Sequence, residues 1–179
     1  MTQYISLLRG INVNGKNKIQ MNQLAELYAL LGFEKIVTYI QSGNVVFEYK
    51  LKKGKEIAEI IEKGIKKQFG ISVPALVMEK KEFEGIIKRN PFLKDKSVDA
   101  AKLHITFFDE EPVKENLNKI AAIDGGKDKI IIDSKTAYLY CPVGYGRTKY
   151  TNTVIENKLK VKATTRNLKT VTAISELLK

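Results

Sequence analysis

The order of apolar patterns along the first 80 residues constrains the fold most strongly. Apolar residues that alternate with polar ones predict strands, and those that recur every three or four positions predict helices. The predicted elements are a strand at 4–9, a helix with apolar positions from 24 to 31, strands at 36–40 and 45–49, a helix with apolar positions from 57 to 69 and a strand at 73–78. Gly32 and Gly70 follow the two helices at the position where a left-handed residue ends a helix. This β-α-β-β-α-β order is that of the ferredoxin-like plait.

The second half of the chain predicts the same order. After a short helix near 81–88 we expect a strand at 102–108, a helix at 112–122, a hairpin of strands at 129–133 and 136–141, a helix ending at 159, an extended segment at 161–165 and a last helix. No residue-level repeat links the halves, so the duplication rests on element order. We predict an α+β fold of two ferredoxin-like (βαββαβ) plait units in tandem, 1–80 and 81–179, with an extra C-terminal helix.

Local signals mark the ends of three helices in the second half. Pro112 suits the first position of a helix, where its missing N–H is not needed. Thr153 and Glu156 have the spacing of a capping box. Asn167 is a favourable N-cap for the last helix.

Composition narrows the function classes. The formal net charge of +11 would attract polyanions such as nucleic acid or an anionic membrane surface. The positive charge is mostly lysine and is spread along the whole chain, a pattern that a lysine-rich proteome also produces. The single cysteine, Cys141, excludes an internal disulfide and a multi-cysteine metal site. With no signal-peptide pattern and no apolar run of about 20 residues, we expect a cytoplasmic protein.

The stretch GINVNGKNK at 10–18 has the outline G-x-x-x-x-G-K of a phosphate-binding loop. Asn17 stands where that loop requires the Ser or Thr that binds Mg²⁺. The predicted helix also starts near Met21 or Asn22, about four residues too late for its dipole to face the phosphates. Asp133 resembles the carboxylate that holds the metal in such proteins, but Asp is equally favoured at the first position of a β-turn.

We therefore interpret GINVNGKNK as a strand-to-helix loop. A looser anion cradle remains open for it. Such a cradle would use the backbone N–H groups of Gly10, Asn14 and Gly15 with the side chain of Lys16 or Lys18.

RNA-binding plaits stack bases on aromatic residues of their central strands. In the first unit, Asn44 and Val46 occupy the two central aromatic positions of the third strand, and Phe47 points to the opposite face. Tyr4 on the first strand suits stacking but stands alone. The first unit therefore lacks the RNA-binding pattern.

The second unit has an aromatic sheet face. Alternation places Tyr138 and Tyr140 on one face, with Leu139 and Cys141 on the other. An aromatic face can stack bases, or it can pack against another sheet or helix. In the neighbouring strand His104, Thr106 and Phe108 share a face, which leaves Leu103, Ile105 and Phe107 for the helices.

Catalytic signals are weak. His104 is the only histidine, and no Ser, Cys or carboxylate lies near it in sequence to form a dyad. Cys141 lies on the apolar side of its strand, so we expect a small buried hydrophobe rather than a nucleophile. No carboxylate pair or metal-ligand spacing stands out. Nothing in the sequence demands an enzyme, and we expect neither a cofactor nor a metal.

Arginine is scarce, and three of the four arginines lie among loop-forming residues: Arg9, Arg147 and Arg166. The planar guanidinium binds carboxylate or phosphate with two parallel hydrogen bonds, which lysine cannot do. These arginines could bind an anionic ligand, or they could satisfy backbone carbonyls or a buried acid.

Four blocks in this order, LLRGINVNGKNKIQM, TYIQSGNVVF, GYGRTK and ATTRNLKTV, resemble the bacterial family catalogued as domain of unknown function 1697. The resemblance runs from the first strand to the last helix. It implies two ferredoxin-like plaits and no established activity. Members usually have Gly at the position of Asn14 and Trp at the position of Leu168. The first departure makes close approach of the loop backbone to an anion harder, and the second removes an aromatic side chain.

We therefore hypothesise a cytoplasmic, cofactor-free binding module for an anionic ligand, either nucleic acid or a phosphorylated small molecule. The ligand would lie in a groove between the two plait units, lined by Arg9, Asn12, Lys16, Asn44, Arg147, Lys149 and Arg166. One alternative is an enzyme acting on a phosphorylated or carboxylated metabolite, in which Tyr39 or a lysine carries protons. The other is a protein-interaction domain whose sheet faces bind a partner. We expect no membrane association, and the sequence does not indicate an oligomeric state.

Overall fold

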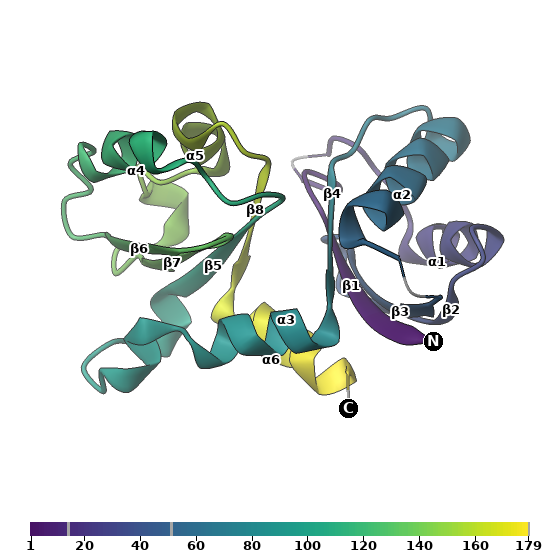
Figure 1. The fold of residues 1–179 in the computed structure, drawn as a ribbon, viewed down its shortest axis with the longest axis horizontal. Helices are drawn as coiled ribbons and strands as arrows, with labels where there is room; N and C mark the ends of the chain where they lie inside the picture. The colour runs from purple at the N-terminus through teal and green to yellow at the C-terminus, as the bar shows by residue number, and fades with distance from the viewer. Residues whose placement is uncertain (14, 51, 179) are drawn as a thin grey trace. The chain divides into compact units, whose positions relative to one another are not determined.

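The structure is a computed structural model that describes residues 1–13, 15–50 and 52–178. The chain divides into two compact units (Figure 1). Unit one comprises Met1–Gly85 together with Ile174–Lys179, and unit two comprises Ile86–Ala173. No helix in the described ranges is long and apolar enough to cross a membrane.

Unit one contains the first predicted plait. Its elements are β1 (Thr2–Leu8), α1 (Met21–Leu30), β2 (Glu34–Tyr39), β3 (Asn44–Tyr49), α2 (Gly54–Phe69) and β4 (Ala75–Glu79). The antiparallel sheet has the order β2-β3-β1-β4, so the first strand lies between the third and the fourth. Gly32 and Gly70 have the left-handed backbone predicted for them, with φ of 84° and 72°. The βαββαβ prediction is confirmed for this unit.

The core of unit one lies between the sheet and helices α1 and α2. Tyr4 and Leu8 of β1 and Phe47 of β3 are fully buried on this face. Tyr28 of α1 is buried as well, and its hydroxyl makes a 2.7 Å hydrogen bond with Ser6 Oγ. Burial raises the pKa of Tyr28 well above its ordinary value. The two hydroxyls thus bond to each other inside an otherwise apolar layer, and buried hydroxyls require such a partner.

Unit two repeats the same order of elements. It begins within α3 (Lys80–Lys88), and the short 3₁₀ helices η1 (Pro91–Lys94) and η2 (Ala100–Lys102) precede its first strand. The plait consists of β5 (Leu103–Phe108), α4 (Lys114–Ala121), β6 (Lys129–Asp133), β7 (Thr136–Tyr140), η3 (Tyr145–Arg147), α5 (Asn152–Leu159) and β8 (Ala163–Asn167), and α6 (Leu168–Leu177) follows. Its antiparallel sheet has the order β6-β7-β5-β8, so the α+β prediction of two plait units with a C-terminal helix is confirmed.

Two of the three predicted helix ends are wrong. Pro112 lies before Val113, the N-cap of α4, so it is outside the helix. Thr151 rather than Thr153 caps α5, with its Oγ1 accepting from Val154 N at 3.3 Å. Glu156 instead accepts from the backbone N–H of Ala163 at 2.9 Å. The third prediction is confirmed, because Asn167 Oδ1 accepts from Thr170 N at 2.8 Å at the start of α6.

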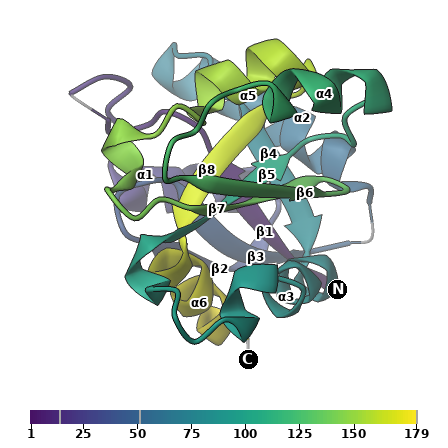
Figure 2. The same cartoon turned by 90° about the vertical axis from the view of Figure 1, so that its left-hand side faces the viewer.

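The helices of unit two cover the face of β5 opposite to the one predicted, whereas Leu139 and Cys141 lie on the apolar side as predicted. Figure 2 shows α4 and α5 together on one side of the sheet. Phe108 and Leu139 pack in the core beneath these helices, together with Cys141. Ile105 and Phe107 lie on the other face and are nevertheless fully buried. Because every position of β5 except His104 is buried, its apolar pattern does not reveal which face the helices cover.

The aromatic face of unit two is occupied by its own chain. Tyr138 is fully buried, and its hydroxyl donates to Ile86 O at 2.9 Å. Tyr140 is half-buried beside the ring of Phe92, with 6.3 Å between ring centroids. These tyrosines are packing residues, which is the structural one of the two predicted roles.

Candidate functional site

The loop between β1 and α1 is a self-bonded turn. Asn12 and Asn17 both have left-handed backbones, with φ of 54° and 48°, which asparagine tolerates better than most residues. Asn12 N donates to Asn17 O at 3.2 Å, and Asn17 Nδ2 donates to Gly10 O at 2.9 Å. Lys16 N donates to Val13 O at 2.9 Å and closes the tip. Asn12 and Asn17 therefore set the shape of the loop.

This geometry excludes a P-loop. Helix α1 begins at Met21, as the sequence predicts, so its N-terminus is displaced from the G-K pair. The backbone N–H groups of Asn12, Lys16 and Ile19 donate within the loop, whereas a phosphate cradle needs such groups free. Asn14, one of the three residues named for a looser cradle, lies outside the described residues.

Asn12 joins this loop to the β2–β3 connection. Its Nδ2 donates to Ile19 O at 2.9 Å and to Gln41 O at 2.8 Å, and its Oδ1 accepts from Ile19 N at 2.9 Å. Both amide hydrogens and the carbonyl oxygen are therefore occupied by backbone. Gly43 lies at the same junction, where an added Cβ would come within 2.7 Å of Leu8 Cβ.

Asn44 is also committed to the β2–β3 connection. It is 1% exposed, and its Nδ2 donates to Tyr39 O at 3.1 Å and to Ser42 Oγ at 2.9 Å. Neither Asn12 nor Asn44 has an amide hydrogen left for a ligand. Of the other predicted residues in unit one, Arg9 is half-buried after β1 and Lys16 is exposed on the loop.

Three predicted residues belong to unit two, and two of them lie on the loop between β7 and α5. We name residues 141–150 the 141–150 loop. Successive turns hold it: Gly144 N donates to Cys141 O at 2.9 Å, and Arg147 N donates to Gly144 O at 3.1 Å. Gly144 has φ of 108°, a conformation that side chains disfavour. Burial raises the pKa of Cys141, the first residue of the loop, so its thiol is not a ready nucleophile.

An aromatic stack fixes the middle of the 141–150 loop. The ring of Tyr145 lies on the ring of His104, with 4.7 Å between centroids and 22° between planes. His104 Nδ1 lies 3.3 Å from Lys102 O. Burial lowers the pKa of His104, and the Lys102 carbonyl offsets part of that shift. The imidazole is therefore mainly neutral at pH 7, and the stack acts as a support for the loop.

Arg147 and Lys149 are exposed on the 141–150 loop. Arg89 pairs with Asp133 at 3.2 Å, and Arg9 and Arg166 also have partners. Within the part of the chain that the structure describes, Arg147 is the only arginine whose guanidinium has no hydrogen-bond or ion-pair partner. An unpaired guanidinium on a structured loop is free to bind an anion.

Arg166 lies on β8, next to Ile105 of β5 in the register of the sheet. Its Nη1 donates to Thr164 Oγ1 and to Thr165 O, both at 2.9 Å. Burial lowers the pKa of Arg166 to about 10, and an electrostatic interaction with Tyr145 opposes that shift. Arg166 therefore stays charged at neutral pH, and Tyr145 of the 141–150 loop favours its charged form.

A hydrogen-bonded chain of two hydroxyls and an amide lies in unit two, and no sequence pattern indicates it. Thr165 Oγ1 donates to Asn152 Oδ1 at 2.7 Å, so Thr106 Oγ1, which is 2.7 Å from Thr165 Oγ1, acts as the donor to Thr165. This chain ties β5 and β8 to the first residue of α5. The sequence does not predict the stack of His104 on Tyr145 either, because no local pattern links GYGRTK to the single histidine.

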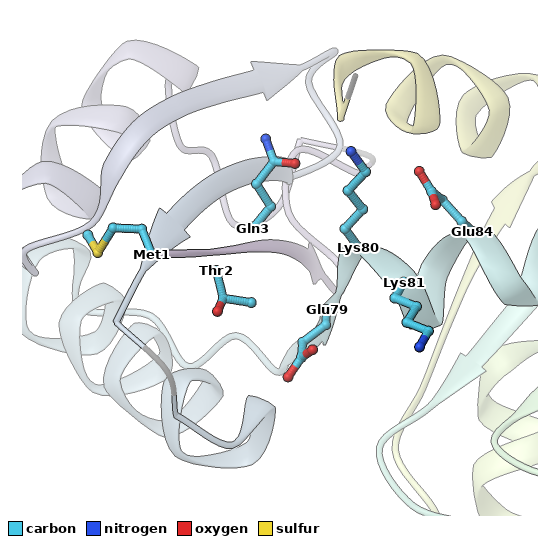
Figure 3. Close-up of a pocket in the computed structure, with 7 residues that line it drawn as sticks. All are labelled: Met1, Thr2, Gln3, Glu79, Lys80, Lys81 and Glu84. Carbon is cyan, nitrogen blue, oxygen red and sulfur yellow. The ribbon is translucent and has the colours of Figure 1, made fainter.

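A shallow pocket lies at the ends of β1 and β4 in unit one (Figure 3). Figure 3 shows Gln3 and Lys80 pointing to one side and Thr2 and Glu79 to the other. Lys80 Nζ donates to the backbone carbonyl of Leu178. The lining residues are Met1, Thr2, Gln3, Glu79, Lys80, Lys81 and Glu84. Two acids oppose two lysines here, and none of the predicted site residues is present, so this pocket is a poor anion site.

Comparison with known proteins gives a family and a fold without an activity. A family model described as "Protein of unknown function (DUF1697)" matches residues 1–138. The blocks GYGRTK and ATTRNLKTV lie beyond that match. None of the curated proteins matches the chain. The solved structure of conserved bacterial protein SP0830 from Streptococcus pneumoniae is 25% identical, covers 99% of each chain and has a TM-score of 0.79.

Proposed function

The chain belongs to the DUF1697 family of proteins of unknown function, and we propose that it is a binding module for an anionic ligand. The binding surface that we propose is the 141–150 loop of unit two, with Arg147 and Lys149 as the contacting side chains. Arg166, which stays charged at neutral pH, adds to the positive potential in unit two. Binding requires no cofactor in this proposal. The single cysteine favours a reducing compartment, which supports a cytoplasmic location as part of the proposal.

The guanidinium of Arg147, which has no partner among the described residues, carries the proposal. The other arginines are already engaged, Arg89 with Asp133 and both Arg9 and Arg166 with partners of their own. Lysine is the default cation of this chain, so an arginine without an internal partner is best explained by an external one. Carboxylate and phosphate groups fit the planar, two-pronged geometry of guanidinium.

The 141–150 loop is preorganised for this role. Internal turns, the stack of Tyr145 on His104, and the hydrogen bond from Tyr150 N to Thr148 Oγ1 at 3.2 Å hold its backbone. Because the loop is ordered before the ligand arrives, binding loses less conformational entropy. Two positive side chains two residues apart then present donors to one phosphate or to neighbouring phosphates.

The other predicted residues have different roles in this proposal. Asn12 and Asn44 shape loops of unit one, since their amide hydrogens are already donated to the chain itself. Lys16 is exposed on its loop and adds to the general positive potential. The ligand class remains either nucleic acid or a phosphorylated small molecule, because both present phosphate oxygens.

An unbiased ligand search tests the proposal. The wild-type protein is purified at low salt, and the material that copurifies is identified by mass spectrometry. Fluorescence anisotropy with labelled single-stranded RNA, duplex DNA and a labelled nucleoside triphosphate then measures affinity at several salt concentrations. For a duplex, the log–log slope of affinity against salt should be about 0.9 per phosphate contact.

The variants have a control matched in charge. R147A/K149A removes two positive charges from the 141–150 loop, and K94A/K96A removes two exposed charges elsewhere in unit two. We expect the first pair to weaken binding at least tenfold, on the scale of losing two charged hydrogen bonds, and the second to weaken it less than threefold. Equal losses of affinity in the two double variants would show that net charge causes the effect. Absence of binding to all three probes at low salt, with no copurifying anion, would refute the proposal.

A further inference from the structure

Strand β6 is an outer strand of the unit two sheet, next to β7 only. Figures 1 and 2 show it at the margin of that sheet. Its sequence is Lys129-Ile130-Ile131-Ile132-Asp133, and Ile131 is 43% exposed. No described strand pairs with its outer edge. An apolar, β-branched edge strand offers free backbone groups for pairing with another strand.

The hairpin register fixes which backbone groups point outward. Asp133 and Thr136 flank the two-residue turn and face each other, so they form a hydrogen-bonded pair. Hydrogen-bonded and non-bonded pairs alternate along an antiparallel ladder. Lys129, Ile131 and Asp133 therefore direct their backbone groups toward β7. Ile130 and Ile132 direct theirs to the open edge.

The outward groups of β6 are complementary to those of a second, antiparallel β6. With Ile131 opposite the partner's Ile131, Ile130 stands opposite the partner's Ile132 and exchanges both backbone hydrogen bonds with it. The same register places Lys129 opposite the partner's Asp133, and the twofold axis repeats each contact. Lysine and aspartate then form non-hydrogen-bonded pairs, in which side chains approach most closely.

We propose that this chain forms a symmetric homodimer through antiparallel pairing of β6 with the β6 of a second copy. Shifting the register by two residues in either direction also aligns outward groups, but it places lysine or aspartate opposite isoleucine. Charged residues at the ends of an edge strand usually oppose pairing with other strands. Here the charged ends favour a partner strand with the opposite order of charges. An antiparallel β6 of a second copy presents that order.

The ion pair of Arg89 with Asp133 is compatible with this dimer. Arg89 Nε contacts Asp133 Oδ2 at 3.2 Å, which leaves Oδ1 to accept from the partner's Lys129. A five-residue strand forms a small interface, at the weak end of protein association. We therefore expect a weak dimer whose population depends on protein concentration.

Charge exchange on β6 tests the dimer directly. K129E places Glu opposite the partner's Asp133, and D133K places Lys opposite the partner's Lys129. Sedimentation velocity across 5–500 µM should show dimer for the wild type and at least tenfold weaker association for each variant alone. An equimolar mixture of the two variants should associate again, because the mixed dimer has opposite charges at both ends. The double variant K129E/D133K should also dimerise.

The controls separate this interface from net charge and from misfolding. K94E changes an exposed lysine elsewhere in unit two and should leave dimerisation within twofold of the wild type. Circular dichroism should show that all variants are folded. If K129E or D133K is unfolded, the association of the double variant and of K94E still tests the interface. A wild type that is monomeric at 500 µM would overturn the proposal. So would a dimer that K129E and D133K leave intact, or two singles that fail to associate when mixed.

Discussion

The ring of His104 on β5 lies against the ring of Tyr145 in the 141–150 loop, with 4.7 Å between centroids. The two residues are far apart in sequence, and the contact holds the loop that carries Arg147 and Lys149 against the sheet. Tyr145 is also coupled electrostatically to Arg166. One tyrosine thus links the three predicted site residues of unit two.

Replacing Tyr145 with Ala should loosen the 141–150 loop without changing the net charge. We expect affinity for the anionic probe to fall about three- to tenfold, because the loop must then be ordered on binding. Tyr145→Phe keeps the ring on His104 and should retain affinity within twofold. Anisotropy titrations at a single salt concentration compare the two. If both variants bind like the wild type, the stack has no part in binding.

His104 should make stability depend on pH. Burial holds the pKa of folded His104 below its ordinary value of 6.5, so the unfolded chain binds the proton more readily. Stability is therefore full above pH 6.5 and falls as the pH drops from 6.5 toward the folded pKa. Urea unfolding between pH 8 and 5 should show a smaller fall in H104Q than in the wild type. Identical pH profiles would contradict this account of His104.

The hydroxyl chain of unit two should contribute to stability. Thr165→Val keeps the side-chain shape but removes the acceptor for Thr106 Oγ1 and the donor for Asn152 Oδ1. Leaving buried polar groups unpaired costs about 1–3 kcal/mol. Thr153→Val, at an exposed position of α5, provides a control that should change the free energy of unfolding by less than about 0.5 kcal/mol. Denaturant unfolding measures both variants. Equal losses in the free energy of unfolding would show that the chain of hydroxyls does not contribute to stability.

Asn12 should be a structural residue. Asn12→Ala removes three hydrogen bonds to backbone and leaves alanine with a positive φ, so we expect a loss of about 2–4 kcal/mol in the free energy of unfolding. Asn22→Ala on the exposed side of α1 is the control and should be nearly neutral. An Asn12→Ala variant as stable as the wild type, with reduced anion binding, would instead restore Asn12 as a ligand contact.

Sequence patterns predicted the two plaits because each strand and helix carries its own apolar period and because Gly32 and Gly70 mark the ends of the first two helices. They did not predict which face of β5 the helices cover, because both faces are buried and alternation is then uninformative. Spacing alone favours Thr153 as a cap, but helix α5 begins at Asn152, so Thr151 caps it.

Residue type alone also placed residues with different roles together in the predicted site. Asn12 and Asn44 are polar and lie near glycines, as ligand-binding residues often do, yet their partners are backbone groups that only the folded loops bring near. The partner of Tyr145 is a histidine about 40 residues earlier, and no local pattern indicates such a contact.

The scarcity of arginine permits one direct test of the central claim. In ¹H–¹⁵N spectra the four arginine Nε–Hε groups give few enough signals to assign by single Arg→Lys variants. Titration with pyrophosphate and with a 12-nucleotide single-stranded RNA should shift the Arg147 signal most, while Arg89, already paired with Asp133, stays within noise. An Arg147 signal that does not move while either probe binds would contradict the proposed site.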